Sequence, residues 1–535
     1  MSTRSWPNQH SDADAARYRA AGQWRDRTIA TALADLSRAE PDRIAIVDAA
    51  GRYSYGDLET KARRLSGWFL AQGLRAGDVV AFQLPNWHEA VVIALSTSML
   101  GLVCLPIVPI YREAEVRFIL EASGAKLFLT PDSFRGFDHG ALADRLAAEI
   151  PTLAAAVRIR GADGPDPLAA EPYEGTPQGT ATEPWLLMYT SGTTGHPKGV
   201  IHCANSLDCE LVNVTGWWDL RADRDVSLMP SPVTHVTGFL YGVIMPFSHG
   251  IPAVLMERWD TAEALRLIAA ERASFMVSAT PFLRELIDTA AANGDALQTL
   301  RVFACGGAPV PPDLIRQAWE RFPGLLACRV YGSTEAPTVT LGVRSRDNLA
   351  DAAETDGHIV GHDVRILDDD GKVLPPGEDG EIRTRGPEMF SGYLDPADDA
   401  AAFDEDGYFR TGDLGHVTPD GYVTVTGRKK DLIIRGGENL SAKEIEDALF
   451  RHPAIREVAV VAMPHPRLGE TCCAYLVTDG RAPDVADLSA FLTEQGLARQ
   501  KHPEKVIVTK VLPRTASGKI QKFVLREELS RETPQ

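Results

Sequence analysis

The most constraining feature of this sequence is the segment 190–199, which reads T-S-G-T-T-G-H-P-K-G. Glycines permit left-handed backbone angles, so successive amide groups can point into one concavity and hold an anion. The hydroxyl groups add hydrogen-bond donors, and the lysine adds a positive charge suited to phosphate. The segment therefore predicts a phosphate-binding loop rather than a plain polar turn between strands. Its candidate binding residues are Thr190, Ser191, Gly192, Thr193, Thr194, Gly195 and Lys198.

The spacing of this loop differs from that of the Walker phosphate loop, G-x-x-x-x-G-K-[ST], which runs into a helix. Counted from Gly192, the sixth position is Pro197, and Gly199 stands where the magnesium-binding hydroxyl residue should be. Residues 199–202 read G-V-I-H, which is typical of a strand. The sequence therefore disfavours a kinase or GTPase of the Walker type.

Size and composition set the broad class. A chain of 535 residues, 44% hydrophobic and 24% charged, is long enough for two or more domains. The formal charge of −18 argues against nucleic acid as a bulk partner, although a local basic pocket for a nucleotide stays open. None of the seven cysteines forms a C-x-x-C pair, so neither a disulfide framework nor a zinc site is expected. Reduced thiols, a polar N-terminus and no long apolar run predict a cytoplasmic protein without a membrane span.

The order of apolar segments predicts an α/β fold. Expected strands at 43–48 and 78–84 alternate with helices at 58–72 and 87–102, and this rhythm continues to about residue 350. We therefore expect a large N-terminal domain of two helix-covered sheets. From about Ile359, short β segments separated by turns predict hairpins and a small β-barrel.

A second, smaller domain is expected after Arg428. The sequence S-A-K-E at 441–444 is a capping-box pattern, and it opens an amphipathic helix. Strands at 458–462, 474–477 and 505–508 and a helix at 485–494 predict an α+β module of about a hundred residues. We place the domains at 1–429 and 430–535, with a hinge near Lys430.

Several further motifs carry functional groups, although each one alone is compatible with an ordinary structural role. His235, in S-P-V-T-H-V-T-G-F, would by itself more often be a packed core histidine. The turns C-G-G-A-P at 305–309 and Y-G-S-T-E at 331–335 follow apolar strands, where a flat ligand can lie against the backbone. The remaining motifs are Y-F-R-T-G-D at 408–413, G-R-K-K-D at 427–431, R-G-G-E-N at 435–439 and P-R-T-A-S-G-K at 513–519.

Taken together and in this order, the motifs resemble those of the adenylate-forming superfamily, which includes acyl-CoA synthetases, peptide-synthetase adenylation domains and luciferases. The resemblance covers nearly the whole chain. It is most specific toward short- and medium-chain fatty acid or cyclohexanecarboxylate CoA ligases, because A-F-Q-L-P at 81–85, A-T-P-F at 279–282 and S-G-K-I-Q-K-F at 517–523 look like that subgroup.

The resemblance implies a role for each matched residue. Lys519 is implied as the catalytic lysine of a mobile C-terminal domain, Glu335 as the Mg²⁺ ligand, Thr334 as a donor to the α-phosphate and His235 as the neighbour of the acyl carboxylate. The adenine slot is implied at Gly307, Ala308, Pro309, Tyr331 and Gly332, the ribose contacts at Asp413 and Arg428, and the pantetheine channel at Gly436 and Gly437. Val236 stands where amino-acid-activating relatives carry aspartate and an aryl-acid group carries asparagine, which implies a substrate without an α-amine or a ring hydroxyl.

The implied activity is an ATP- and Mg²⁺-dependent acyl-CoA ligase that joins a small-molecule carboxylic acid to coenzyme A through an acyl-adenylate. Two alternatives stay open: an adenylation enzyme that loads a carrier protein, and a catalytically silent nucleotide-binding protein. The same resemblance implies possible acylation of Lys519. Gly238 and Gly242 suggest room for the acyl group, but the sequence does not determine the acid or whether the chain forms a homo-oligomer.

Overall fold

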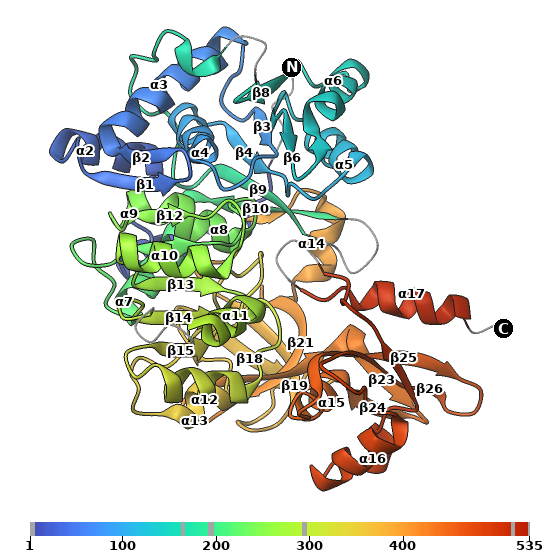
Figure 1. Cartoon of the computed structure of the whole chain (residues 1–535). Helices are drawn as coiled ribbons and strands as arrows, with labels where there is room; N and C mark the ends of the chain where they lie inside the picture. The colour runs from blue at the N-terminus through green and yellow to red at the C-terminus, as the bar shows by residue number, and fades with distance from the viewer. Residues whose placement is uncertain (1–5, 162–165, 191–196, 291–296, 515–518, 533–535) are drawn as a thin grey trace.

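The computed structural model describes residues 6–161, 166–190, 197–290, 297–514 and 519–532 of the chain. Two seven-stranded sheets form the N-terminal domain, as predicted (Figure 1). The first sheet is parallel except for its edge strand β2. Its order is β15 (Leu326–Arg329), β14 (Val302–Cys305), β13 (Phe275–Ser278), β11 (Ser227–Met229), β12 (Ala253–Leu255), β1 (Ile44–Asp48) and β2 (Gly51–Ser54).

The second sheet mixes parallel and antiparallel pairs. Its order is β20 (Gly392–Tyr393), β10 (Lys198–Cys203), β9 (Pro184–Thr190), β4 (Val103–Pro106), β3 (Val79–Phe82), β5 (Leu127–Pro131) and β8 (Ala155–Ile159). The pairs from β9 to β8 are parallel, whereas β10 is antiparallel to both of its neighbours. The strand expected at 199–202 is therefore confirmed within β10.

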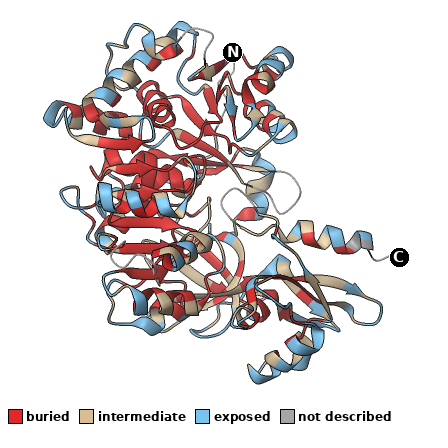
Figure 2. Ribbon diagram, in the orientation of Figure 1, coloured by how far each residue is buried: buried red, intermediate tan, exposed pale blue. Residues whose placement is uncertain are grey.

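One continuous core joins the two sheets. Helix α4 (His88–Leu100) is buried at every position, because beyond its first turn the helix carries only apolar, small and hydroxyl side chains. The core around it includes Ile46 of the first sheet and Phe82 of the second. Figure 2 shows the strands of both sheets as mostly buried, with exposed residues gathered on the outer helices. Among the described residues, no helix combines the length and apolarity that a membrane crossing requires.

Further helices cover the sheets and connect their strands. They are α1 (Asp12–Ala20), α2 (Ile29–Ala39), α3 (Tyr55–Ala71), α5 (Glu113–Ser123), α6 (His139–Glu149), α7 (Ala204–Trp217), α8 (Val236–Phe239), α9 (Met245–Ser248), α10 (Thr261–Glu271), α11 (Thr280–Ala290), α12 (Pro312–Arg321), α13 (Leu349–Glu354) and α14 (Pro396–Ala402).

The expectation of a small β-barrel is wrong. The hairpins after Ile359 form an open antiparallel sheet in the order β18 (Asp363–Leu367), β19 (Gly380–Arg385), β21 (Phe409–Val417) and β22 (Val423–Arg428). Strands β18 and β22 stand at opposite edges, and no barrel closes among the described strands. The C-terminal domain lies against β22, where the Ser441 hydroxyl donates to the Thr426 carbonyl at 2.5 Å. Turn residues predict hairpins, but closure depends on which distant partner meets the edge strand.

The C-terminal domain has its own sheet and lies at the lower right of Figure 1. Its strands are β24 (Glu438–Ser441), β23 (Leu432–Arg435), β26 (Gly469–Thr478) and β25 (Ile455–His465), with β27 (Lys505–Val508) parallel to β26. Its helices are α15 (Ala442–Leu449), α16 (Val485–Glu494) and α17 (Lys522–Glu532). Ser441 caps α15 by accepting from the Glu444 N–H, as the sequence predicted. The helix predicted at 485–494 is confirmed as α16.

A buried ionic cluster joins the two N-terminal sheets. Asp48, at the end of β1, accepts hydrogen bonds from the His88 N–H at 2.9 Å and the His88 ring at 3.0 Å. Arg160, which follows β8, binds both oxygens of Glu89 at 2.6 and 2.7 Å. Burial alone would raise the pKa of Asp48, but the hydrogen bonds from His88 outweigh it and lower the pKa to about 2. The charged form of Asp48 therefore stabilises the contact between the sheets.

Because the pKa of Asp48 is lower in the folded than in the unfolded chain, its contribution of about 2 kcal/mol is present above pH 4 and disappears as the pH falls toward 2. We expect Asp48→Asn to lower Tm at pH 7, and the difference from wild type to shrink as the pH falls below 4. Asp35→Asn, which alters an exposed ion pair, is the control. A pH series of thermal unfolding measures both, and a Tm difference independent of pH would contradict the role of charge.

The segment 166–182 lies against α3 through one glycine. A Cβ atom on Gly67 would lie 1.9 Å from the Glu171 carbonyl oxygen. Arg63, one turn earlier, donates to the Tyr173 and Gly175 carbonyls at 2.9 and 3.2 Å. The close approach therefore requires a residue without a side chain.

We expect Gly67→Ala to cost about 1–3 kcal/mol, because the added methyl group displaces the segment 166–182. Gly216→Ala is the matched control: Gly216 also lies in a helix, but an added Cβ would meet nothing within 4 Å. That variant should gain about 0.5–1 kcal/mol from the better helix propensity of alanine. Thermal unfolding should therefore show opposite Tm shifts, and equal shifts would refute the packing argument.

Candidate active site

A small cavity opens where parallel strands of the first sheet end. Strands β13, β14 and β15 all finish on this side, which is where ligands bind in open α/β sheets. The cavity has a volume of about 70 Å³. Its lining comes from four segments, within 231–241, 277–279, 306–307 and 330–338, and from Lys519.

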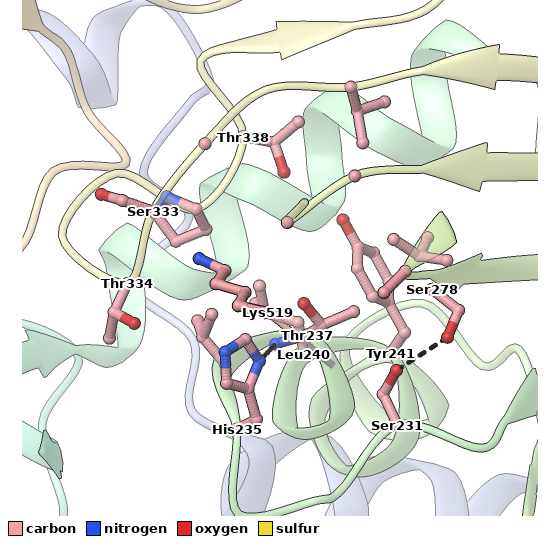
Figure 3. Close-up of a pocket in the computed structure, with 18 residues that line it drawn as sticks. Ser231, His235, Thr237, Leu240, Tyr241, Ser278, Ser333, Thr334, Thr338 and Lys519 are labelled. Atoms are coloured by element: carbon pink, nitrogen blue, oxygen red, sulfur yellow. Dashed lines mark hydrogen bonds between the residues drawn. The ribbon is translucent and has the colours of Figure 1, made fainter. Parts of the chain in front are cut away.

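Lys519 reaches this cavity from the C-terminal domain. Figure 3 shows its amine between His235 and Ser333. A Cβ atom on Gly307 would lie 3.7 Å from Lys519 Cε, and Gly307 has a left-handed φ of 77°. Burial, and then the charge of Arg428, lowers the pKa of Lys519. The structure thus brings Lys519 together with residues that lie about 180 to 290 positions earlier in the chain.

His235 is a neutral hydrogen-bonding group on the cavity wall. Burial, and then the positive charge of Lys519, lowers the pKa of His235 to about 3. The ring caps α8 by accepting from the Thr237 N–H at Nδ1, over 3.4 Å. The ring hydrogen therefore lies on Nε2, where it can be donated to an anion.

Sheet register creates an acidic and basic pair beside Lys519. Asp413 of β21 lies opposite Arg428 of β22, and Arg428 Nε binds Asp413 Oδ1 at 2.6 Å. The Tyr331 hydroxyl donates to Asp413 Oδ2 at 2.8 Å. Three of the residues assigned to the nucleotide are therefore in direct contact, although they come from three separate motifs.

The loop that carries Thr334 and Glu335 is held by residues that the sequence analysis missed. His202 Nε2 donates to the Thr334 carbonyl at 2.7 Å. The Tyr393 hydroxyl donates to Glu335 Oε1 at 2.8 Å, and the Phe390 N–H donates to the Glu335 carbonyl at 2.9 Å. These partners are more than 50 residues away in sequence, and no local motif marks them.

Glu335 fits the predicted Mg²⁺ site. Magnesium takes hard oxygen ligands and is often held by one or two carboxylates together with substrate phosphates. The Glu335 carboxylate is half-buried near the Lys519 amine, whose pKa it raises. The role of Glu335 as the ligand stays a prediction.

The predicted phosphate loop is described only at its ends. Thr190 ends β9 and pairs with Lys198 at the start of β10, while Ser191, Gly192, Thr193, Thr194 and Gly195 lie outside the described residues. Lys198 Nζ forms an ion pair with Asp398 at 2.8 Å and lies 4.9 Å from the centre of the Tyr393 ring. Its role in phosphate binding stays a prediction.

The glycines predicted for the adenine slot line the cavity, whereas those predicted for the pantetheine channel do not. Gly307 and Gly332 line the cavity, and Ala308 and Pro309 follow directly in the chain, with the Pro309 carbonyl accepting from the Thr280 hydroxyl at 2.8 Å. Gly436 and Gly437 form the left-handed turn between β23 and β24 and do not line the cavity that holds Lys519. The resemblance implied that this turn enters the site only for thioester formation, which stays a prediction.

The suggestion that Gly238 and Gly242 leave room for the acyl group is wrong. A Cβ on Gly238 would lie 2.0 Å from the Pro232 carbonyl oxygen, and one on Gly242 would lie 3.0 Å from Leu255 Cδ2. Both glycines therefore permit close packing of their helical segment, and side chains around the cavity set its shape.

Comparison with known proteins gives consistent matches along the chain. Residues 33–394 match the family of AMP-binding enzymes, and residues 444–519 match the AMP-binding enzyme C-terminal domain. The chain is 39% identical to a medium-chain fatty-acid–CoA ligase of Escherichia coli (strain K12), over 97% of this chain and 94% of that protein. It is 32% identical to the 2,3-dihydroxybenzoate-AMP ligase of Bacillus subtilis (strain 168), over 98% and 97%.

Solved structures match as well. ATP-bound MatB from Rhodopseudomonas palustris superposes with a TM-score of 0.83 at 31% identity, covering 93% of this chain and 98% of that one. The o-succinylbenzoate CoA synthetase of Bacillus subtilis, in complex with an acyl-adenylate, gives 0.81 at 26%, covering 94% and 98%.

The hydrogen bond from Tyr393 to Glu335 is expected to orient this carboxylate for Mg²⁺. Tyr393→Phe removes the donor that fixes the carboxylate, so we expect apparent Mg²⁺ affinity to fall by about 10-fold or more, as for other residues that orient a metal ligand. The measurement is a Mg²⁺ titration, both of activity and of ATP binding by calorimetry. Tyr408→Phe is the matched control, since it removes a tyrosine bond to Asp363 outside the cavity. Equal Mg²⁺ requirements in both variants would contradict the assignment.

Proposed function

We propose that this chain, which belongs to the AMP-binding enzyme family, is an ATP-dependent acyl-CoA ligase for short- or medium-chain carboxylic acids. The observation that carries the proposal is the position of Lys519, whose amine from the C-terminal domain lies in the cavity of His235 and Thr334. Glu335, Asp413 and Arg428 are close enough to change its pKa. The 39% identity to a medium-chain fatty-acid–CoA ligase supports the choice of substrate class.

In the first half-reaction, the substrate carboxylate attacks the α-phosphorus of ATP and pyrophosphate leaves. Both reactants are anions, so the site must offset their repulsion. The Lys519 amine supplies a positive charge, and neutral His235 can donate from Nε2 to the carboxylate. Mg²⁺ bound at Glu335 would neutralise charge on the phosphate oxygens.

In the second half-reaction, the thiol of coenzyme A attacks the acyl-adenylate carbonyl and AMP leaves. Lys519 fills part of the cavity, so the C-terminal domain has to move before the thiol can enter. Lys430, the proposed hinge residue, lies in the single turn η3 (Lys429–Asp431) between β22 and β23. This turn links the sheets of the two domains, at the proposed boundary between 1–429 and 430–535.

The lining of the cavity supports an apolar acyl group. Val236, Leu240, Val277 and Val330 line it together with neutral hydroxyl residues. Lys519 is the one lysine or arginine among the described lining residues, which include no aspartate or glutamate. An ammonium or second carboxylate on the substrate would lack a buried partner there. A simple fatty or alicyclic acid carries no second charged group and needs no such partner.

A carrier protein is the alternative acceptor, because one relative, at 32% identity, is named a salicyl-AMP ligase and salicyl-S-ArCP synthetase. The first half-reaction is then unchanged, and an assay that offers both thiols decides between them. Acylation of Lys519 would remove its charge and block adenylation, and it requires the buried amine to leave the cavity first. A cytoplasmic location and a homo-oligomer remain predictions.

Lys519→Ala tests the proposal. We expect adenylate formation, measured as pyrophosphate release, to fall by about 100-fold or more, because a charge that stabilises the transition state is lost. Conversion of preformed acyl-adenylate to the thioester should change little. Lys522→Ala, three residues away and paired with Glu446, is the control for the stability of the C-terminal domain. Equal loss in both half-reactions would contradict the role of Lys519.

A further inference from the structure

Tyr241 lines the side of the cavity that faces away from Ser333 and Thr334. Figure 3 shows Tyr241 opposite Ser333 and Thr334, beside Ser231 and Ser278. An acyl chain whose carboxylate lies near Lys519 would extend toward this ring. Tyr241 is 3% exposed and packs edge-on against Phe275, with ring centres 5.6 Å apart. The ring therefore cannot move aside without disturbing the core.

The backbone at Tyr241 is also unusual. Residues 240–244 form the π-turn η2 (Leu240–Ile244), which interrupts the helical run between α8 and α9. Such insertions occur often at functional sites, because they change the direction of the side chains they carry. Gly242, in the same turn, packs closely on Met229 and Leu255, so the turn is fixed from behind.

A buried carboxyl group fixes the hydroxyl of this tyrosine. Tyr241 donates to Glu210 Oε1 at 2.6 Å, and the hydroxyl of Thr338, another cavity residue, donates to the same oxygen. Glu210 is fully buried in α7. Its Oε2 has no hydrogen-bond partner among the described residues, and the carboxyl group of Glu388 is close enough to affect its pKa. Burial, and then the charge of Glu388, raises the pKa of Glu210 well above its ordinary value.

The surroundings of Glu388 complete this network. Asn213 donates to Glu388 Oε1, and His362 Nε2 lies 3.4 Å from Oε2. Burial lowers the pKa of His362 to about 4, so the ring is neutral. Two carboxyls that meet without a cation between them share a proton. Glu210, the carboxyl whose pKa burial and Glu388 raise well above its ordinary value, keeps that proton and holds both hydroxyl groups as a neutral group behind the acyl site.

We infer that Tyr241 is a specificity-determining residue that limits the length of the acyl chain, and that Glu210 is the positioning residue that holds it. The inference rests on the proposed function and narrows its substrate to acids with short or compact acyl groups. Longer straight chains would collide with the ring.

The test compares kcat/KM for butanoate and decanoate, measured by pyrophosphate release. Tyr241→Leu opens the wall, so we expect the decanoate-to-butanoate ratio to rise by about 10-fold or more, since each methylene group in an apolar site changes kcat/KM by about 10–200-fold. Tyr55→Leu is the matched control, because Tyr55 is another buried tyrosine, bonded to the Pro246 carbonyl, that does not line the cavity. Its ratio should equal that of wild type.

Variants that break the hydrogen bond between Tyr241 and Glu210 test whether this bond positions the aromatic ring. Tyr241→Phe and Glu210→Ala should raise the ratio in the same direction but less. Glu210→Gln keeps an oxygen acceptor for both hydroxyls and should restore the wild-type ratio. A purely structural defect would lower activity on both acids and leave the ratio unchanged.

An unchanged ratio in Tyr241→Leu, with butanoate still activated, would overturn the inference and leave the proposed function intact. Release of pyrophosphate by the wild type with no acid at all would overturn the proposed function, and the inference with it.

Discussion

The cation of Lys519 joins the two domains of this molecule into one site. The Lys519 amine belongs to the C-terminal domain, yet it lies in a cavity of the N-terminal domain. Placing an ammonium group away from water is costly unless opposite charges are near. Asp413 and Glu335 supply those charges and raise the pKa of Lys519, against burial and Arg428, which lower it. When the C-terminal domain docks, it therefore also brings the positive charge of Lys519 into the site.

The carboxylates that compensate Lys519 are placed by long-range sheet geometry. Asp413 faces Arg428 because β21 and β22 pair in that register, and a slip of one residue would turn Asp413 to the other face. Glu335 follows β15, and β20 brings Tyr393 to it from the second sheet. Each of these two carboxylates is thus positioned by an element from a different part of the N-terminal domain. A change in the packing of either element would move the carboxylate that it positions.

Local chemistry explains which features the sequence could predict. The helix at 485–494 was found because its cap and apolar spacing are contained in its own residues. The motif residues near Lys519 were found because they resemble a known family. The barrel was wrong because closure depends on edge strands that meet only in space. His202, Tyr393 and Glu210 were missed for the same reason, since their partners lie 132, 58 and 31 residues away.

Two tyrosine–carboxyl hydrogen bonds near the cavity serve opposite purposes. At one end, Tyr393 donates to half-buried Glu335, which stays accessible to a cation. On the other side, Tyr241 donates to Glu210, which is fully buried beside Glu388. Burial and the neighbouring Glu388 set Glu210 apart, because a carboxyl group enclosed beside another carboxyl group resists ionisation. The site is therefore polarised along its length: charge is concentrated where phosphate would react, and a neutral wall stands where an apolar chain would end.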